Sequence, residues 1–166
     1  MNSPAALGNP ADERPTPAVR LASALRSRLS PEAAVRTDEP LARRTTLRVG
    51  GTADVLVEPA HEADLAAVLE EARRLSVPWR VIGRGSNLLV RDGGLRGLVI
   101  CLAHPFFARL EVSGSRILGG AGARLKDLAA EARRHGLAGL EFLAGIPGSV
   151  GGALRMNAGA WNAATF

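Results

Sequence analysis

The chain has 166 residues, of which 46% are hydrophobic, so it can bury the core of one domain or of two small lobes. Its 21 basic and 16 acidic residues give a formal charge of +5, which suits anionic ligands, and Lys126 is its single lysine. A solvated arginine-rich surface explains this charge better than nucleic-acid binding, because the sequence contains no basic run and no aromatic stacking platform.

The N-terminal part is rich in proline. Pro4, Pro10, Pro15 and Pro17 predict that residues 1–18 form a disordered leader. The spacing of Leu21, Leu25 and Leu29 then predicts a short amphipathic helix that ends at Ser30-Pro31. A connection over residues 36–40 follows it. We therefore assign residues 19–40 to a helix and linker, and residues 41–166 to a ligand-binding domain.

The next segments alternate between strand and helix. A strand is expected over residues 53–58, a helix over 62–75 and a second strand over 79–82. The second strand runs directly into the glycine loop 83–87. This order is typical of a βαβ unit, in which loops at the ends of strands bind ligands.

The second half is β-rich before it becomes helical. Strands are expected over residues 98–102, 110–112 and 116–118, with a hairpin turn at 113–115. A helix over 123–134 should end at Gly136. Cys101, in the apolar run 97–103, is interpreted as a buried small hydrophobe. As the only cysteine it fits a reducing compartment, and with no apolar run of about 18 residues and no signal peptide, the expected location is the cytoplasm.

Gly83-Arg-Gly-Ser-Asn-Leu88 is the first candidate site. It lacks the last glycine of the dinucleotide fingerprint, and no Gly-Lys-Ser/Thr follows as in a P-loop. Small residues at 83, 85 and 86 would let backbone N–H groups converge on an anion such as a pyrophosphate, with Ser86 and Asn87 as further donors. The alternative is an ordinary glycine turn between strands.

Two further glycine-rich segments strengthen the first interpretation. Gly119-Gly-Ala-Gly-Ala123 follows another expected strand, and the segment 139–159 contains glycines at 139, 145, 148, 151, 152 and 159. Such a backbone bends repeatedly and admits close approach. Together the segments indicate a flat, phosphate-bearing ligand.

These motifs resemble a known family in their order and spacing. The motifs are Thr45-Thr-Leu-Arg-Val-Gly-Gly51, Gly83-Arg-Gly-Ser-Asn-Leu-Leu-Val90, Asp92-Gly-Gly94, the segment 139–152 and Met156-Asn-Ala-Gly-Ala160. Residues 41–160 are similar to the N-terminal part of UDP-N-acetylenolpyruvoylglucosamine reductases, also called UDP-N-acetylmuramate dehydrogenases. The resemblance implies an α+β, two-lobed FAD-binding domain of the vanillyl-alcohol oxidase (PCMH) type over residues 41–166, with the substrate domain absent from this chain.

The resemblance also implies where FAD is held. The loop 83–89 would cradle the pyrophosphate, and the segments after 119 and 146 would line the adenine and the ribityl-isoalloxazine path. No histidine lies between residues 62 and 103 to tether the flavin, which implies non-covalent binding. The implied cofactor-binding residues are Thr46, Val49, Gly50, Gly83, Arg84, Gly85, Ser86, Asn87, Leu88, Leu89, Gly120, Ala121, Gly122, Glu141, Gly145, Ile146, Pro147, Gly148, Ser149, Gly151, Gly152, Asn157 and Gly159.

The family's reaction is implied only in outline. NADPH reduces FAD, the flavin reduces the enolpyruvyl ether of UDP-N-acetylenolpyruvoylglucosamine to UDP-N-acetylmuramate for peptidoglycan synthesis, and a serine supplies a proton. The family's catalytic serine, arginine and glutamate lie beyond the equivalent of Phe166, so no catalytic residue is assigned. Two alternatives remain open: a truncated FAD-binding product without turnover, and a non-enzymatic nucleotide-binding module.

Several single residues keep two interpretations. Arg84 pairs with a phosphate or is solvated, and Glu141 bonds a cofactor hydroxyl or caps nearby backbone N–H groups. Arg155 is expected near the flavin or substrate. Ser149 is interpreted as a turn donor rather than a nucleophile, because no His/Asp pattern accompanies it. His104 is expected at a strand end, and no set of residues has metal-ligand spacing.

Overall fold

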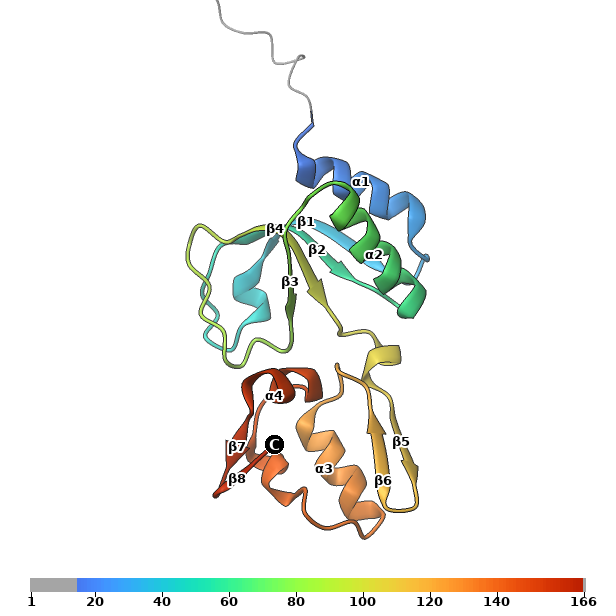
Figure 1. Cartoon of the computed structure of the whole chain (residues 1–166). Coiled ribbons are helices and arrows are strands. Elements are labelled where there is room, and N and C mark those ends of the chain that lie inside the picture. Colours follow the sequence, from blue (N-terminus) through green and yellow to red (C-terminus); the bar gives the residue numbers. More distant parts are fainter. Residues whose placement is uncertain (1–14, 166) are drawn as a thin grey trace, which may run out of the picture.

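The computed structural model describes residues 15–165, which form two lobes joined through the segment 102–109 (Figure 1). Most of the expected leader, residues 1–14, lies outside the described residues. Its last part was assigned wrongly, because Pro17 and Ala18 begin helix α1 (Pro17–Arg28). The side chain of Thr16 accepts a hydrogen bond from the Val19 N–H, and proline at the first helical position costs no helical hydrogen bond.

The first lobe is a four-stranded sheet with helices on one face. Its strands are β1 (Ala34–Pro40), β2 (Thr52–Glu58), β3 (Trp79–Ile82) and β4 (Leu95–Cys101), in the order β1-β2-β4-β3. β1 runs antiparallel to β2, whereas β2, β4 and β3 are parallel. The parallel strands therefore end at the same edge of the sheet, which is the edge that faces the second lobe (Figure 1).

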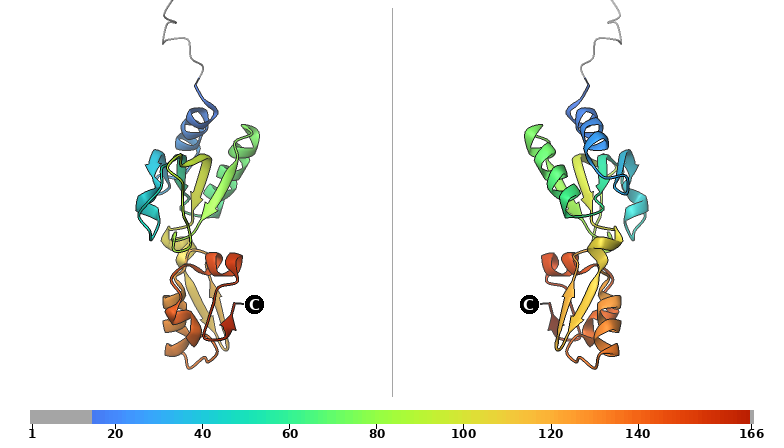
Figure 2. Two further views of the ribbon diagram at one scale, coloured as in Figure 1. Left: turned by 90° about the vertical axis from the view of Figure 1, so that its left-hand side faces the viewer. Right: turned by 90° about the vertical axis from the view of Figure 1, so that its right-hand side faces the viewer.

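Each face of this sheet has its own core. Helices α1 and α2 (Glu62–Arg74) cover one face, where Leu21, Leu25, Val68 and Ile100 are fully buried. The 3-10 helix η2 (Leu41–Arg44) covers the other face, where Leu41 packs with Leu56 and Val99 of the sheet. The two views of Figure 2 show the helices and the η2 segment on opposite sides of the sheet. The expected strand at 53–58, helix at 62–75 and strand at 79–82 are confirmed.

The connection expected over residues 36–40 is wrong, because these residues belong to β1. β1 is an edge strand whose middle residues are exposed, so it carries polar residues instead of the hydrophobic alternation that signals a half-buried strand. Asp38 has a φ of +52° and Pro40 ends the strand. Both features are tolerated because, among the described residues, the outer side of β1 pairs with no other strand.

The second lobe is built on a hairpin and a helix. It contains β5 (Leu110–Ser113), β6 (Arg116–Gly119), α3 (Leu125–Arg134) and α4 (Val150–Met156), together with the 3-10 helix η4 (Glu141–Gly145) and the short pair β7 (Gly159–Ala160) and β8 (Ala163–Ala164). Another 3-10 helix, η3 (Pro105–Ala108), precedes it. The hairpin and the helical end near Gly136 are confirmed, and the fold is α+β with two lobes as expected. Helix α3 begins at Leu125, two residues later than expected, because the carbonyl of Ala123 accepts from the N–H of Val150 instead.

Candidate functional site

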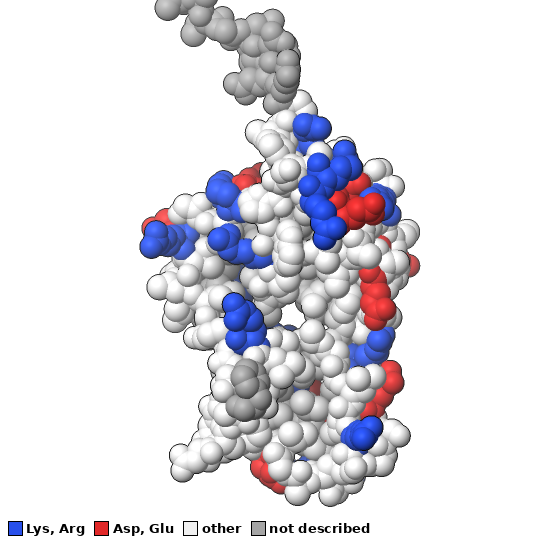
Figure 3. Space-filling model, viewed as in Figure 1, with Lys and Arg blue, Asp and Glu red and all other residues white. Residues whose placement is uncertain are grey.

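A cleft of about 1550 Å³ is lined by residues of both lobes. The first lobe contributes the segment after η2, strand β3 and the loop 83–88, and the second lobe contributes residues 121–122, 146–149 and α4. Figure 3 shows the surface hollowed at the waist between the lobes, with a basic side chain beside the hollow. The cleft therefore lies at the carboxyl ends of the parallel strands, where open α/β sheets bind ligands.

The glycine loop follows β3 and lies over the end of η2. The N–H of Thr46 donates to the carbonyl of Gly85, with 3.1 Å between N and O. Gly85 has a φ of +68°, and a Cβ at this position would lie 1.8 Å from the Arg44 carbonyl oxygen. Only glycine fits between the loop and η2 at this point. The contact with η2 thereby fixes the path of the loop across the cleft.

The opposite wall is the turn Gly148–Ser149 at the start of α4. Ser149 is buried, and its Oγ accepts a hydrogen bond of 3.4 Å from the Gly152 N–H as the N-cap of α4. Ser149 thus bonds the backbone at a turn, but its Oγ is the acceptor of this hydrogen bond and not the donor that was expected. A Cβ on Gly83 would lie 2.9 Å from Ser149 Oγ, so the loop and the turn nearly touch.

Several glycines of the candidate motifs serve the packing of the protein. A Cβ on Gly120 would lie 2.1 Å from the Phe107 carbonyl oxygen, and one on Gly122 would lie 1.9 Å from that of Leu102. A Cβ on Gly151 would lie 3.0 Å from the Cβ of Ala121. Such glycines were expected to admit the close approach of a ligand. In the structure the close neighbour is another segment of the same chain.

The cleft brings most of the expected cofactor-binding residues together. Those that line it are Thr46, Gly83, Arg84, Gly85, Ser86, Asn87, Leu88, Ala121, Gly122, Ile146, Pro147, Gly148, Ser149, Gly151, Gly152, Asn157 and Gly159. Arg155 also lines it. They come from segments up to about a hundred residues apart, so the grouping follows from the two-lobed fold and not from proximity in sequence.

Six of the expected residues do not line this cleft: Val49, Gly50, Leu89, Gly120, Glu141 and Gly145. A Cβ on Gly50 would lie 2.6 Å from the Cβ of Val90, and one on Gly145 would lie 3.0 Å from the ring of Trp161. Both glycines are therefore explained by packing. Leu89 is 74% exposed and belongs to none of the core clusters of the described residues.

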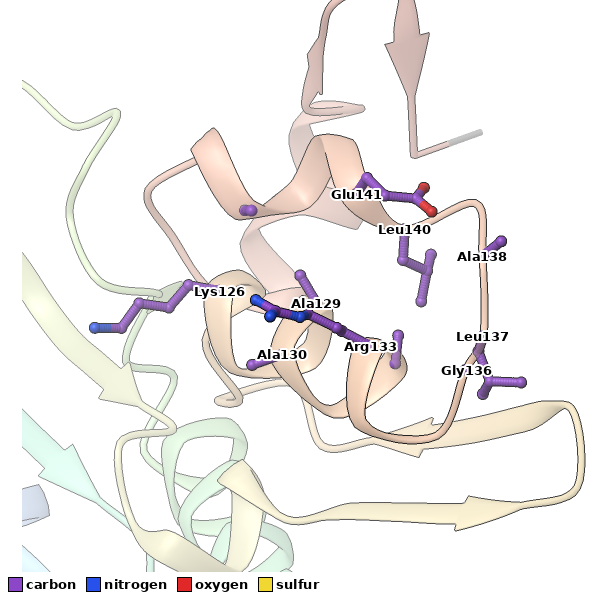
Figure 4. Close-up of a pocket in the computed structure, with 11 residues that line it drawn as sticks. Lys126, Ala129, Ala130, Arg133, Gly136, Leu137, Ala138, Leu140 and Glu141 are labelled. Carbon is purple, nitrogen blue, oxygen red and sulfur yellow. The ribbon is translucent and has the colours of Figure 1, made fainter.

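Glu141 faces a second, smaller hollow. This pocket of about 510 Å³ lies between α3 and the segment 136–144, with Lys126, Arg133 and Glu141 among its lining residues (Figure 4). One carboxylate oxygen of Glu141 accepts a hydrogen bond of 2.9 Å from the Gly139 N–H. Of the two interpretations of Glu141, this contact corresponds to the capping of backbone N–H groups.

Four arginines that had no expected role at a binding site line the cleft. Besides Arg84 and Arg155, the cleft is lined by Arg43, Arg44, Arg48 and Arg80, and no Asp or Glu of residues 15–165 lines it. Arg44 forms ion pairs, whereas the other five arginines form none within the described part of the chain. The signal in the sequence was the placement of Arg43, Arg44 and Arg48 around Thr45-Thr46. A cleft with this charge attracts anionic groups.

Arg44 differs because it is held by two carboxylates. Its guanidinium lies 2.9 Å from Glu39 and 2.5 Å from Glu58, and Arg36 lies 2.6 Å from the other oxygen of Glu58. Burial alone would raise the pKa of the Glu58 carboxyl, but the hydrogen bonds from Arg36 and Arg44 outweigh it and hold that pKa below its ordinary value. These charges fasten η2 to β1 and β2 beneath the glycine loop.

Cys101 ends β4 and lines the cleft with little exposure. It is 6% exposed, and burial raises the pKa of its thiol. Its interpretation as a buried hydrophobic residue of a strand is confirmed. Within residues 15–165, no three His, Cys, Asp or Glu side chains gather in a way that could hold a metal ion. No helix in the same part of the chain is long and apolar enough to cross a membrane.

Comparisons with known proteins show the family to which the chain belongs. Residues 53–166 match the family of proteins described as "FAD binding domain". The chain is 51% identical over 142 residues to the UDP-N-acetylenolpyruvoylglucosamine reductase of Geobacter sulfurreducens, covering 85% of this chain and 46% of that protein. It is 56% identical over 126 residues to the reductase of Paramagnetospirillum magneticum, covering 76% of this chain and 40% of that protein. The chain thus spans less than half the length of these relatives.

Solved structures give the same result for the fold. The reductase of Thermus caldophilus superposes with a TM-score of 0.64 at 41% identity, over 80% of this chain and 45% of that one. A 4-ethylphenol oxidase of Gulosibacter chungangensis superposes with a TM-score of 0.55 at 16% identity, over 70% of this chain and 24% of that one, which shows the fold alone. The expected vanillyl-alcohol oxidase (PCMH) type of fold is confirmed. The chain belongs to the family of FAD-binding domains and is a homologue of the N-terminal part of UDP-N-acetylenolpyruvoylglucosamine reductases.

Proposed function

We propose that the cleft between the lobes binds FAD without a covalent bond. The observation that carries the proposal is a cleft of about 1550 Å³ with six arginines, no carboxylate among its described lining residues and a glycine loop at its centre. Two phosphates need cations and N–H donors, and flat rings need smooth backbone walls. The donor set of this cleft fits the diphosphate of a dinucleotide.

The residues divide between the parts of the cofactor. The loop 83–88 with Arg84 and Arg80 would hold the diphosphate from the first lobe. Residues 146–149 and the glycines of α4 would line the rings from the second lobe. When bound, FAD supplies the ability to accept and pass on a hydride. The chain's own part is to neutralise the phosphates, orient the rings and exclude water from one side of them.

We further propose that this chain is the FAD-binding part of an NADPH-dependent reductase of UDP-N-acetylenolpyruvoylglucosamine, acting in the cytoplasm in peptidoglycan precursor synthesis. The support is the identity of about half of the aligned residues to reductases of that name. A separate substrate domain would complete the binding site for the small-molecule substrate. We propose that residues 41–166 form the cofactor domain. The alternative is a truncated product that binds FAD but has no activity. A measurement of turnover distinguishes the two.

The first test is a titration of the purified chain with FAD, followed by flavin fluorescence. Asn87→Asp adds a negative charge within the loop 83–88 with little change in the size of the side chain, and it should weaken binding roughly tenfold or more. Asn162→Asp is the matched control: it makes the same change of charge at an exposed residue outside the cleft, and it should leave affinity unchanged. Equal affinities for both variants would contradict a diphosphate at the loop.

The second test addresses the reaction. NADPH oxidation by the FAD-loaded chain is measured with and without UDP-N-acetylenolpyruvoylglucosamine. Oxidation that depends on the substrate supports the reductase proposal. FAD binding without such oxidation favours a cofactor domain that needs another segment for turnover. A folded chain that binds no FAD but binds nucleic acid with a steep salt dependence would favour the non-enzymatic module.

A further inference from the structure

Within residues 15–165, the main chain crosses between the lobes once, through the segment 102–109 (Figure 1). One covalent crossing acts as a hinge and does not by itself fix the width of a cleft. On the hinge side, Arg109 lies 3.7 Å from Glu62 of α2 and over the ring of Phe106. The position of the lobes on the cleft side must come from contacts across the cleft.

Ser86 makes such a contact. Its hydroxyl donates to the carbonyl oxygen of Pro147, with 2.9 Å between the two oxygens. The two segments are closely packed beside this bond: a Cβ on Gly83 would lie only 2.9 Å from Ser149 Oγ, and one on Gly148 would be in ordinary contact with Ser86 Oγ at 3.5 Å. The glycine loop of one lobe and the turn of the other thus meet at this hydroxyl.

Both ends of the bond are anchored in their own lobes. On one side, the N–H of Thr46 holds the carbonyl of Gly85. On the other side, the carbonyl of Gly148 accepts from the N–H of Leu125 at the start of α3, and the N–H of Val150 donates to Ala123. A displacement at the hydrogen bond would therefore move whole lobes and not merely two loops.

We propose that Ser86 is a positioning residue that sets the width of the cleft by joining the two lobes, and that it is not a donor to the phosphates. A hydroxyl has one proton, and Ser86 gives it to Pro147. The phosphates are then left to the backbone N–H groups and the arginines. Only one consequence of this inference, the effect of Ser86 on the affinity for FAD, rests on the proposed FAD site. The effect on lobe position is independent of any ligand.

The lobe positions are tested without ligand. Spin labels on Arg73→Cys in α2 and Arg116→Cys in β6 report the distance between the lobes, and both sites are exposed whereas the native Cys101 is buried. Ser86→Ala should broaden or shift the distance distribution, and Ser86→Thr, which keeps the hydroxyl, should restore it. Ser115→Ala in the hairpin turn is the control and should change nothing. An unchanged distribution in Ser86→Ala would overturn the proposal.

Two probes then separate a positioning residue from a phosphate donor. FAD must contact both lobes, and its affinity should fall about three- to tenfold in Ser86→Ala, the effect of one hydrogen bond. Inorganic pyrophosphate reports on the loop alone, and its affinity should stay within about twofold of wild type. Equal losses for both probes would show that Ser86 donates to phosphate. If the wild-type chain binds no FAD, the proposed function fails, and the distance measurement still decides the role of Ser86.

Discussion

Gly85 lies where the glycine loop turns back over η2, with a φ of +68° and the carbonyl oxygen of Arg44 only 1.8 Å from the place that a Cβ would occupy. A side chain here would meet backbone on one side and an unfavourable dihedral angle on the other. Gly85→Ala should therefore lower the free energy of unfolding by about 3 kcal/mol, since strain and a displaced backbone add. Urea unfolding followed by circular dichroism measures the change.

Gly93→Ala is the control for this substitution. A Cβ at Gly93 meets no atom within 4 Å, so this variant should unfold within about 0.5 kcal/mol of wild type. Similar losses of stability for Gly85→Ala and Gly93→Ala would mean that η2 does not press on the loop.

The glycines also show what a glycine-rich sequence can predict. The repeated glycines located most of the cleft correctly, but sequence alone could not show that the close neighbour of Gly85 or Gly122 is protein backbone.

At the scale of elements, the hydrophobic pattern predicted α1, α2, α3, the strands β2, β3 and β4 and the hairpin, and it missed β1 and the glycine-rich helix α4. Leu65, Val68 and Leu69 mark α2 because a half-buried helix repeats every 3.6 residues. β1 has no such signal, since its middle is exposed and its partners lie on one side alone. Four arginines of the cleft were missed for a related reason: their charge marks a surface, and only the fold gathers Arg43, Arg48 and Arg80 around one cleft.

The carboxylates that fasten η2 give a dependence on pH. The pKa of Glu58 is lowered in the folded protein, so its stabilising contribution is present above the ordinary carboxyl pKa of about 4.3 and is lost as the pH falls through the lowered value. Glu58→Gln should destabilise the chain by roughly 1–2 kcal/mol at pH 7, allowing for partial solvent exposure of the pair. The difference from wild type should shrink below about pH 4.

Thermal unfolding at several pH values measures this difference. Glu32→Gln, at an exposed carboxylate with no ion pair in the described structure, should follow the wild-type curve at every pH. A Glu58→Gln variant that matched wild type at pH 7 would show that Arg44 is held by Glu39 alone.

At the scale of the whole molecule, the two lobes have unequal cores. The first lobe buries residues on both faces of its sheet, including Leu21, Leu56 and Ile100. In the second lobe, the core cluster has three buried residues, Leu125, Leu143 and Ala153, with partly buried neighbours around them. Because stability follows buried apolar area, the second lobe should open at a lower free energy than the first. One wall of the cleft thus belongs to the more stable lobe and the other wall to the less stable lobe.

This difference predicts how a ligand would act on the chain. Hydrogen exchange of the ligand-free protein should show amides of α3 and of the hairpin β5–β6 opening at a free energy several kcal/mol below those of β2 and β4. A ligand that binds only when both walls are in place stabilises the weaker wall by mass action, so FAD at a hundred times its Kd should raise protection in α3 by up to about 2.7 kcal/mol. Protection that rose only in the loop 83–88 would place the ligand on the first lobe alone. Equal opening free energies in both lobes before FAD is added would mean that the contacts between the lobes, such as Ser86 with Pro147, already make the chain one cooperative unit.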